Sequence, residues 1–275
     1  LSSSSAASDV YKRQDLLRES GVKITDIHAG GGTPSLLSGS DFHGILDTIA
    51  ESFDSDQKIA IEANPDDLKD EGKVSGLVDS GVSEVSLGVQ SFNRKTLKKL
   101  GRTHTEVESI ASIENLRAAG IDHLNADMMY MVPGQTLEEW VDDLRMAAEQ
   151  DIDEITCYPT LITSHCIGYK MIRSRRTEPQ PDKSIFRKMV YETFGTLEPA
   201  GYESVEIYGF CREDGWKYAT VNYEMEGPLL GFGCGATGFT GGYEYQNVCL
   251  PEEYIRSIRK GDFPIAGSRF VDIKE

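Results

Sequence analysis

The amino-acid sequence predicts an α/β fold built on a parallel sheet. From Asp15 onward, short apolar segments alternate with longer amphipathic ones, which is typical of strands and helices joined by right-handed crossovers. Glycine or polar residues follow several of the strands, at the sheet edge where α/β proteins bind ligands. The pattern fits a doubly wound sheet or a β/α barrel, and 275 residues suffice for one large domain with or without a smaller one.

The elements follow in a regular order after the end of a helix near Gly21. Strands are predicted at 24–29, 58–62, 84–89, 123–129, 154–161 and 201–208. Helices are predicted at 41–53, 66–79, 93–100, 105–119, 136–150 and 183–197. The first of these helices places apolar side chains on one face: Phe42, Ile45, Leu46, Ile49 and Ala50. The last is expected to turn inward Ile185, Phe186, Met189, Val190, Phe194 and Leu197.

Residues 1–14 differ from the rest of the chain. They contain four consecutive serines and show no helical or strand period that leads into Asp15. We interpret them as a foreign leader, with a disordered tail as the alternative, and leave them out of the fold prediction.

Charge and cysteine content narrow the class of protein. The 28 basic and 45 acidic residues give a net charge of −17, which disfavours nucleic acid or an anionic membrane surface as the main partner. No apolar run reaches the roughly 20 residues that span a bilayer, so we expect a cytoplasmic protein. The cysteines are odd in number and scattered, which fits neither a disulfide framework nor a zinc ribbon. Each is expected to be reduced and buried as a small apolar side chain: Cys157, Cys166, Cys211, Cys234 and Cys249.

A glycine-rich segment follows the first predicted strand. Gly30, Gly31 and Gly32 precede Thr33 and Pro34, so bare backbone is exposed where another molecule could approach closely. A tight turn without a ligand is the alternative, and a phosphate loop is a weaker one because the segment lacks its lysine.

Polar side chains also end the next strands. Glu62, Gln90 and Asp127 each stand at or near the carboxyl end of a predicted strand. Any one of them alone more often caps a helix or a loop than binds a ligand. Together, after successive strands, they are expected to converge on one rim of the sheet.

Five sequence blocks, in this order, resemble one family. They are GGGTPSLL at 30–37, EANP at 62–65, SLGVQSF at 86–92, LGRTH at 100–104, and VPGQT at 132–136 following Asp127. Residues 15–160 are similar to the radical S-adenosylmethionine enzymes of the HemN/HemW type, which comprise oxygen-independent coproporphyrinogen III oxidases and their haem-chaperone relatives. The resemblance implies a partial β/α barrel over residues 15–170, with a smaller α+β extension over 171–275 on the substrate side.

The resemblance also implies S-adenosylmethionine and a [4Fe–4S] cluster as cofactors. Glu62 would accept hydrogen bonds from ribose hydroxyls, and the planar guanidinium of Arg102 would bind the methionine carboxylate. A surface salt bridge is the alternative role for Arg102. The full set of implied cofactor-binding residues is Gly31, Gly32, Thr33, Glu62, Gln90, Arg102 and Asp127.

The chain departs from the family at the cluster. Relatives hold it through a Cys-x-x-x-Cys-x-x-Cys loop upstream of the glycine segment, whereas no cysteine here precedes Cys157. Three thiolates are needed to leave one iron open for the cofactor. We therefore expect a barrel that lacks its first β/α unit, and favour a truncated sequence over a relative that naturally has no cluster.

The expected function follows from the same resemblance. Oxidative decarboxylation of coproporphyrinogen III is the leading interpretation, and a haem chaperone or a haem-degrading radical methyltransferase is the alternative within the family. A catalytically inactive barrel that binds haem or a partner protein is the alternative outside it. The implied partners are a tetrapyrrole and an electron donor such as flavodoxin or ferredoxin.

Two later segments carry weaker signals. Arg173, Arg175 and Arg176 belong to a polar stretch that we interpret as a solvated loop, with contact to tetrapyrrole propionates as the alternative. The glycine-rich residues 227–236 resemble a late block of the family. Tyr218 and Asn222 stand near the place of its usual His-Asn and Tyr-Trp signature, which weakens the inference of a porphyrinogen substrate.

Overall fold

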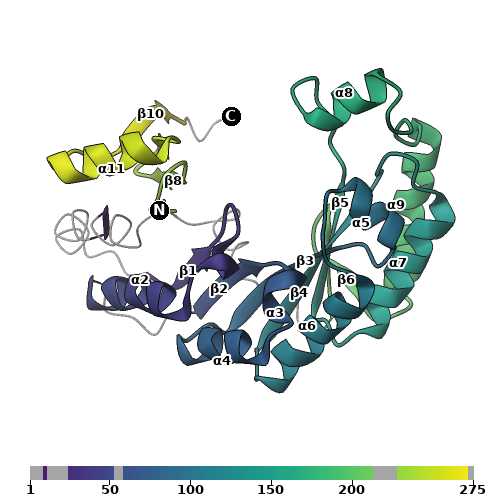
Figure 1. Ribbon diagram of the computed structural model, residues 1–275, viewed down its shortest axis with the longest axis horizontal. Coiled ribbons are helices and arrows are strands. Elements are labelled where there is room, and N and C mark those ends of the chain that lie inside the picture. Colours follow the sequence, from purple (N-terminus) through teal and green to yellow (C-terminus); the bar gives the residue numbers. More distant parts are fainter. Residues whose placement is uncertain (1–8, 11–23, 53–57, 213–227, 272–275) are drawn as a thin grey trace. The chain divides into compact units, whose positions relative to one another are not determined.

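A computed structural model describes residues 9–10, 24–52, 58–212 and 228–271 (Figure 1). The chain divides into two compact units. Unit 1 contains residues 1–60, 79–81 and 219–275, and unit 2 contains residues 61–78 and 82–218. Each unit is described by itself below.

The main sheet is α/β in character, as predicted. Its strands run in the order β1-β2-β3-β4-β5-β7-β6, and the pairs β3–β4 and β4–β5 are parallel. At its end β7 pairs antiparallel with both β5 and β6. The strand bounds are β1 Asp26–Ala29, β2 Lys58–Ala63, β3 Glu84–Gln90, β4 His123–Tyr130, β5 Glu154–Pro159, β6 Glu203–Ser204 and β7 Gly209–Cys211.

Helices connect the parallel strands, and their ends are set by local hydrogen bonds. Thr105 and Thr136 each form a capping box with the glutamate three residues later, which fixes the start of α6 and of α7. Trp140 on α7 is fully buried and donates from its indole nitrogen to Thr193 Oγ1 on α9 at 3.0 Å. The helical bounds are η1 Pro34–Leu36, α2 Gly39–Ser52, α3 Pro65–Leu68, α4 Glu71–Asp79, α5 Arg94–Lys99, α6 Glu106–Ala118, α7 Leu137–Glu149, α8 Ile167–Arg173 and α9 Lys183–Leu197.

Two predicted elements were wrong in detail. The helix expected at 66–79 is two helices, α3 and α4, because the Asp70 carboxylate accepts from the Lys73 backbone N–H at 2.9 Å and starts a new helix there. The strand expected at 201–208 is instead the short hairpin of β6 and β7, which turns back at residues 205–208. Phe186, expected to face inward on α9, remains 37% exposed.

A second, antiparallel sheet lies in unit 1, in the order β10-β9-β8. Asn247 on β9 donates to the carbonyl oxygens of Gly231 and Gly233 at 3.1 and 2.8 Å, so the late glycine block is bonded to this sheet. The bounds are β8 Thr237–Thr240, β9 Tyr243–Asn247, α11 Pro251–Lys260 and β10 Ile265–Phe270.

Some expectations fall on residues that are not described. The helix end near Gly21, and Tyr218 and Asn222, lie outside the described residues. Within residues 1–14, Asp9 accepts from the Tyr254 hydroxyl at 2.7 Å and Val10 is buried. The leader and the domain boundary near residue 170 stay predictions.

None of the five cysteines, all of which lie in the described residues, forms a disulfide. Cys157 and Cys211 are buried as predicted, and burial raises the pKa of the Cys157 thiol far above its ordinary value. The prediction was wrong for Cys249, which is exposed, and for Cys166 and Cys234, which are only partly buried. Among the described helices, none is both long and apolar enough to cross a bilayer.

Candidate functional site

The central strands of unit 2 have one apolar face and one polar face. Alternate residues of β3 and β4, such as Val85, Leu87 and Leu124, are completely buried, as expected where helices cover a sheet. The residues between them are polar: Ser86 on β3, Asn125 and Asp127 on β4, and Glu154 and Thr156 on β5. A polar face inside a sheet of parallel strands is costly unless its groups are hydrogen-bonded.

These polar side chains form a continuous hydrogen-bonded chain across three strands. His123 Nε2 lies 3.0 Å from Glu154 Oε2. Thr156 Oγ1 donates to Asn125 Oδ1 at 2.9 Å, and Asn125 Nδ2 donates to Ser86 Oγ at 2.8 Å and to Asp127 Oδ1 at 3.1 Å. The orientation of each side chain is therefore fixed by its neighbours, with Asp127 at the carboxyl-terminal end of the chain of bonds.

Asp127 is one of the titratable groups of this network. Loss of hydration on burial raises the pKa of its carboxyl group to about 6, although the hydrogen bonds from Ser86 and Asn125 act in the opposite direction. The negative charges of Glu62 and Glu154 raise the pKa further. Glu62 and Asp127, two of the predicted site residues, are thus close enough to interact electrostatically.

Arg102 is held by a neutral partner. Its Nη1 donates to Asn64 Oδ1 at 2.8 Å, and Asn64 immediately follows β2. In the described parts of the chain no carboxylate lies within ion-pair distance of Arg102. The salt-bridge alternative is therefore not what the structure contains, and the remaining guanidinium donors stay available to an anionic ligand.

Gly88 is a point of close approach between β2 and β3. A Cβ atom placed there would lie 2.9 Å from Gln90 Nε2 and 3.2 Å from Asn64 Oδ1. The amide of Gln90 and that of Asn64 thus lie over the same glycine. Only glycine leaves room for both amides, so Gln90, Asn64 and Arg102 form one connected group.

Gln90 has a strained backbone. Its φ is +66°, in the left-handed region that non-glycine residues rarely adopt, and the Ser91 N–H donates to the Val89 carbonyl at 2.8 Å. This is a γ-turn with positive φ, a rare and strained conformation. Such strain persists only where the surrounding structure compensates for it.

Two buried side chains hold that turn. His104 Nε2–H donates to the Val89 carbonyl at 3.0 Å, and burial lowers the pKa of His104. Asp143 on α7 accepts from the Ser91 hydroxyl at 2.6 Å and from the Phe92 N–H at 2.7 Å. Because these bonds lie on both sides of Gln90, they fix its backbone and the direction of its side chain.

The loop after β4 is tied to the segment that follows α8. Lys99 Nζ donates to the Pro133 carbonyl at 2.7 Å and pairs with Glu178 at 3.1 Å. Gln180 Nε2 donates to the Met131 and Thr160 carbonyls at 2.9 and 2.7 Å. The VPGQT block is therefore anchored at the carboxyl edge of the sheet.

The glycine segment belongs to unit 1. Gly31 and Gly32 have φ of +75° and +70°, and a Cβ atom at either would meet nothing within 4 Å. The backbone there is exposed, as the sequence predicted. That Gly31, Gly32 and Thr33 share a ligand with the residues of unit 2 stays a prediction.

Of the seven predicted residues, unit 2 contains Glu62, Gln90, Arg102 and Asp127. Sequence reasoning assigned no positioning role to the residues that hold them, chiefly Asn64, His104 and Asp143. Asn64 and His104 lie inside quoted blocks, so a signal existed for them. Asp143 lies 51 residues from its partner Phe92, and no local pattern indicated it.

Comparison with known proteins identifies the family. A family model described as the radical SAM superfamily matches residues 7–147, more than half of the chain. The chain belongs to the radical SAM superfamily. A protein of Bacillus subtilis named heme chaperone HemW is 30% identical over 92% of this chain and 67% of its own length. A Lactococcus lactis protein of the same name is 35% identical over 86% of this chain and 62% of its own length.

A solved structure agrees on the fold. Coproporphyrinogen III oxidase HemN from Escherichia coli matches with a TM-score of 0.84 and 22% identity, over 98% of this chain and 64% of that protein. The chain is thus of the HemN/HemW type and has the α/β fold of this group, without a closed barrel among the described strands. It spans about three fifths to two thirds of the length of these relatives.

Radical SAM proteins use S-adenosylmethionine and a [4Fe–4S] cluster. The described residues of this chain contain no group of three His, Cys, Asp or Glu side chains that could hold a metal ion, and Cys157 and Cys211 are buried thiols. These residues do not fit a cluster. The polar residues of unit 2 do fit S-adenosylmethionine, because the Arg102 guanidinium keeps donors beyond its bond to Asn64, and Glu62 and Asp127 supply carboxylates near the carboxyl ends of β2 and β4.

Proposed function

We propose that this chain is part of a haem chaperone that binds S-adenosylmethionine. The curated relatives that support this carry the name heme chaperone HemW at 30–35% identity. They favour the chaperone, the alternative inferred from the sequence, over coproporphyrinogen oxidation, because the oxidase is matched at 22% identity, a level that carries the fold alone.

Within this proposal, unit 2 supplies the part of the S-adenosylmethionine site that its residues can form. Arg102, oriented by Asn64, binds the methionine carboxylate through its free donors. Glu62 accepts from ribose hydroxyls, and Gln90 offers an amide held in place by its turn. Asp127, with a pKa of about 6, accepts hydrogen bonds mainly above that pH. Bound S-adenosylmethionine supplies radical chemistry in this superfamily.

The observation that carries the cofactor proposal is the single bond between Arg102 and Asn64. Isothermal titration of the chain with S-adenosylmethionine tests it. Arg102→Ala is expected to weaken binding by about 10- to 100-fold, the equivalent of a lost charge-assisted pair. Arg94→Ala, on the exposed face of α5, is the control and should leave the affinity unchanged. Equal affinities for the two variants would refute the assignment.

The haem proposal is tested separately, by titrating the chain with ferric haem and following the Soret band. We expect saturable binding, and weaker binding of coproporphyrin III, which has no iron. Preference for the metal-free tetrapyrrole would favour the oxidase interpretation instead. Absence of binding to either tetrapyrrole would contradict both.

Two further parts of the proposal rest on the family alone. We infer an electron donor of the flavodoxin or ferredoxin type, since radical chemistry requires one electron for each S-adenosylmethionine. We also infer a cytoplasmic location, which a fractionation experiment on the source cells tests. Recovery of the protein outside the cytoplasmic fraction would contradict that location.

A further inference from the structure

One surface of unit 2 differs in charge from the rest of the chain. It is formed by residues 161–176, here called the α8 segment, which contain helix α8. The segment has four basic residues and no acidic one, although the chain as a whole carries a charge of −17. It therefore presents a local positive surface that favours an anionic ligand. The basic residues are Lys170, Arg173, Arg175 and Arg176.

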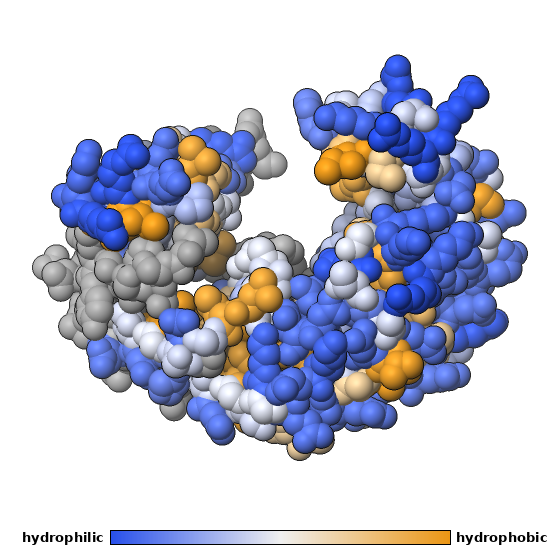
Figure 2. All heavy atoms as spheres, viewed as in Figure 1, coloured by the Kyte–Doolittle hydropathy of each residue, from blue (hydrophilic) through white to orange (hydrophobic). Residues whose placement is uncertain are grey.

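The same segment exposes large apolar side chains. Leu161 and Ile167 are 81% and 75% exposed, and Met171 is 39% exposed. Ile162 by contrast lies against α8, because a Cβ atom on Gly168 would be 3.7 Å from its Cδ1. Figure 2 shows hydrophobic surface directly beside hydrophilic side chains in the region that carries α8 in Figure 1. Covering such side chains with an apolar ligand would be favourable.

Helix α8 ends in an unusual way. The Arg175 N–H donates to the Ile172 carbonyl at 3.0 Å, and the Arg176 N–H donates to the Met171 carbonyl at 2.9 Å. This is the Schellman ending, in which glycine normally takes the left-handed position. Here Arg175 occupies it with a φ of +54°, so a charged side chain is kept at a position where glycine would relieve strain.

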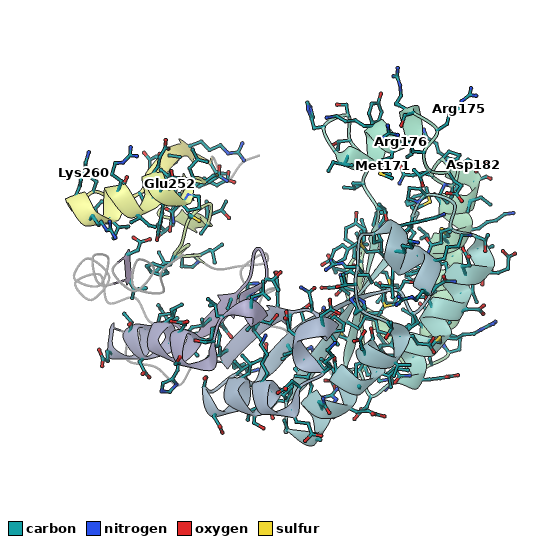
Figure 3. The ribbon with its side chains drawn as sticks, viewed as in Figure 1. Met171, Arg175, Arg176, Asp182, Glu252 and Lys260 are labelled. Atoms are coloured by element: carbon teal, nitrogen blue, oxygen red, sulfur yellow. The ribbon has the colours of Figure 1, made fainter. Side chains whose placement is uncertain are left out.

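The side chains of Arg175 and Arg176, at this end of α8, make no polar contact within the described part of unit 2. Among the described residues, neither the Arg175 nor the Arg176 guanidinium takes part in a hydrogen bond or an ion pair. Figure 3 shows both, with Met171, at the end of α8. Arg173 differs, because its guanidinium lies 5.8 Å from the ring centre of Tyr169. Arg175 and Arg176 can therefore bind carboxylates without breaking an existing contact.

A metal-binding side chain is present in the same segment. His165 is exposed, and within the described structure its side chain takes part in no hydrogen bond or ion pair. The thiol of the neighbouring Cys166 is already hydrogen-bonded, since it donates to the Thr163 carbonyl at 3.0 Å and accepts from the Tyr169 N–H. Imidazole is a common axial ligand of haem iron, so His165 can serve as the iron donor of this segment.

We propose that the α8 segment is a haem-binding surface. Haem is a planar apolar ring with an iron at its centre and two propionate groups at one edge, and the segment offers a matching group for each part. His165 binds the iron, Leu161 and Ile167 contact the ring, and Arg175 and Arg176 pair with the propionates. The inference rests on the proposed haem-chaperone function and names where on the chain that function resides.

The test is a titration of the whole chain with ferric haem, followed by absorbance and electron paramagnetic resonance. Arg175→Ala combined with Arg176→Ala is expected to weaken binding about tenfold, the value of two partly exposed ion pairs. Arg259→Ala combined with Lys260→Ala, on exposed positions of α11, removes the same charge and should leave haem affinity unchanged. His165→Ala should abolish the signature of imidazole ligation, and added imidazole should restore it.

Arg175→Gly separates binding from folding. Glycine relieves the left-handed backbone, so this variant should melt at a higher temperature and yet bind haem more weakly. A purely structural role for Arg175 would not produce that combination.

The outcomes distinguish the proposed haem-chaperone function from the proposed location of the haem site at α8. If the unaltered chain fails to bind haem, the proposed function is wrong. If it binds haem and the α8 variants bind equally well, the function stands and the α8 site is wrong. If the variants keep haem affinity but lose binding to phosphatidylglycerol vesicles, the surface serves an anionic lipid and the haem site is also refuted.

Discussion

The Asp143 carboxylate gives the sharpest test of how the Gln90 turn is held. Asp143 is 2% exposed and accepts hydrogen bonds from the Ser91 hydroxyl and the Phe92 N–H. Asp143→Ala would leave both donors buried without an acceptor. Asp143→Asn removes the charge and keeps one carbonyl oxygen that can accept from the Phe92 N–H, while its NH2 group faces the Ser91 hydroxyl, which can turn to accept. Comparison of the two variants therefore separates loss of the hydrogen bonds from loss of the ionisation.

The magnitudes follow from the environment of the carboxyl group. Burial, the main cause, raises the pKa of Asp143 from 3.8 to about 6, and this difference corresponds to about 3 kcal/mol. Because the pKa is raised in the folded protein, the stability that this group contributes is fully present below pH 3.8 and is lost as the pH rises through 6. Asp143→Asn should therefore reduce the fall in stability between pH 4.5 and pH 7.5 by about 2 kcal/mol.

Asp143→Ala should instead destabilise the fold at both ends of that range. Each buried donor left without an acceptor costs about 1–3 kcal/mol, partly offset by removal of the buried charge. We expect a net loss of about 2–4 kcal/mol near pH 4, where the carboxyl group is protonated, and a smaller loss at pH 7.5. Loosening of the Gln90 turn should also weaken S-adenosylmethionine binding in this variant.

Urea unfolding at pH 4.5 and pH 7.5, followed by tryptophan fluorescence, measures both effects, since Trp140 is buried on the same helix. Asp127 has a pKa raised in the same direction, so some pH dependence will remain in every variant. The reasoning fails if Asp143→Asn shows the same loss of stability with rising pH as the unaltered protein.

Two further substitutions test the site edge. Gly88→Ala should displace the amides of Gln90 and Asn64 and weaken S-adenosylmethionine binding by about tenfold or more. Gly195→Ala, with open space around it in α9, should leave the affinity unchanged. Equal affinities of the two variants in titration calorimetry would contradict the role of Gly88. Gln180→Ala removes two bonds to carbonyls that follow β4 and β5 and should lower the free energy of unfolding by about 1–2 kcal/mol. Gln150→Ala, which removes one bond within its own helix, should cost less, and the reverse order in urea unfolding would contradict this account.

Local sequence pattern predicted most of the elements of the main sheet. The helices α2, α6, α7 and α9 and the strands β3, β4 and β5 appear within a few residues of the expected bounds. These elements could be predicted from the periodic spacing of their apolar residues, because one face of each element is buried against its neighbours. The pattern failed at 201–208, because an antiparallel return after Ser204 depends on pairing with β5, which is distant in the sequence.

The candidate site was predicted in part for the same reason. Glu62, Gln90 and Asp127 could be named because each stands at or near the carboxyl end of a strand, and Arg102 because it stands in a recognisable block after α5. The raised pKa of Asp127 could not be predicted from the sequence, since it arises from burial and from charges on other strands. Nor could the role of Asp143 be named, because its partners lie on a different element.

The sequence by itself determined the α/β class, the family resemblance and the strand-end residues, because these depend on local order along the chain. Only the tertiary structure decided that Arg102 is held by Asn64 rather than by a carboxylate, that Gln90 is strained, and that Arg175 ends α8 in a left-handed conformation. Each of these depends on distances or backbone angles that sequence order does not specify. The seven residues named from the sequence are thus candidate contacts, and folding determines which neighbours orient them.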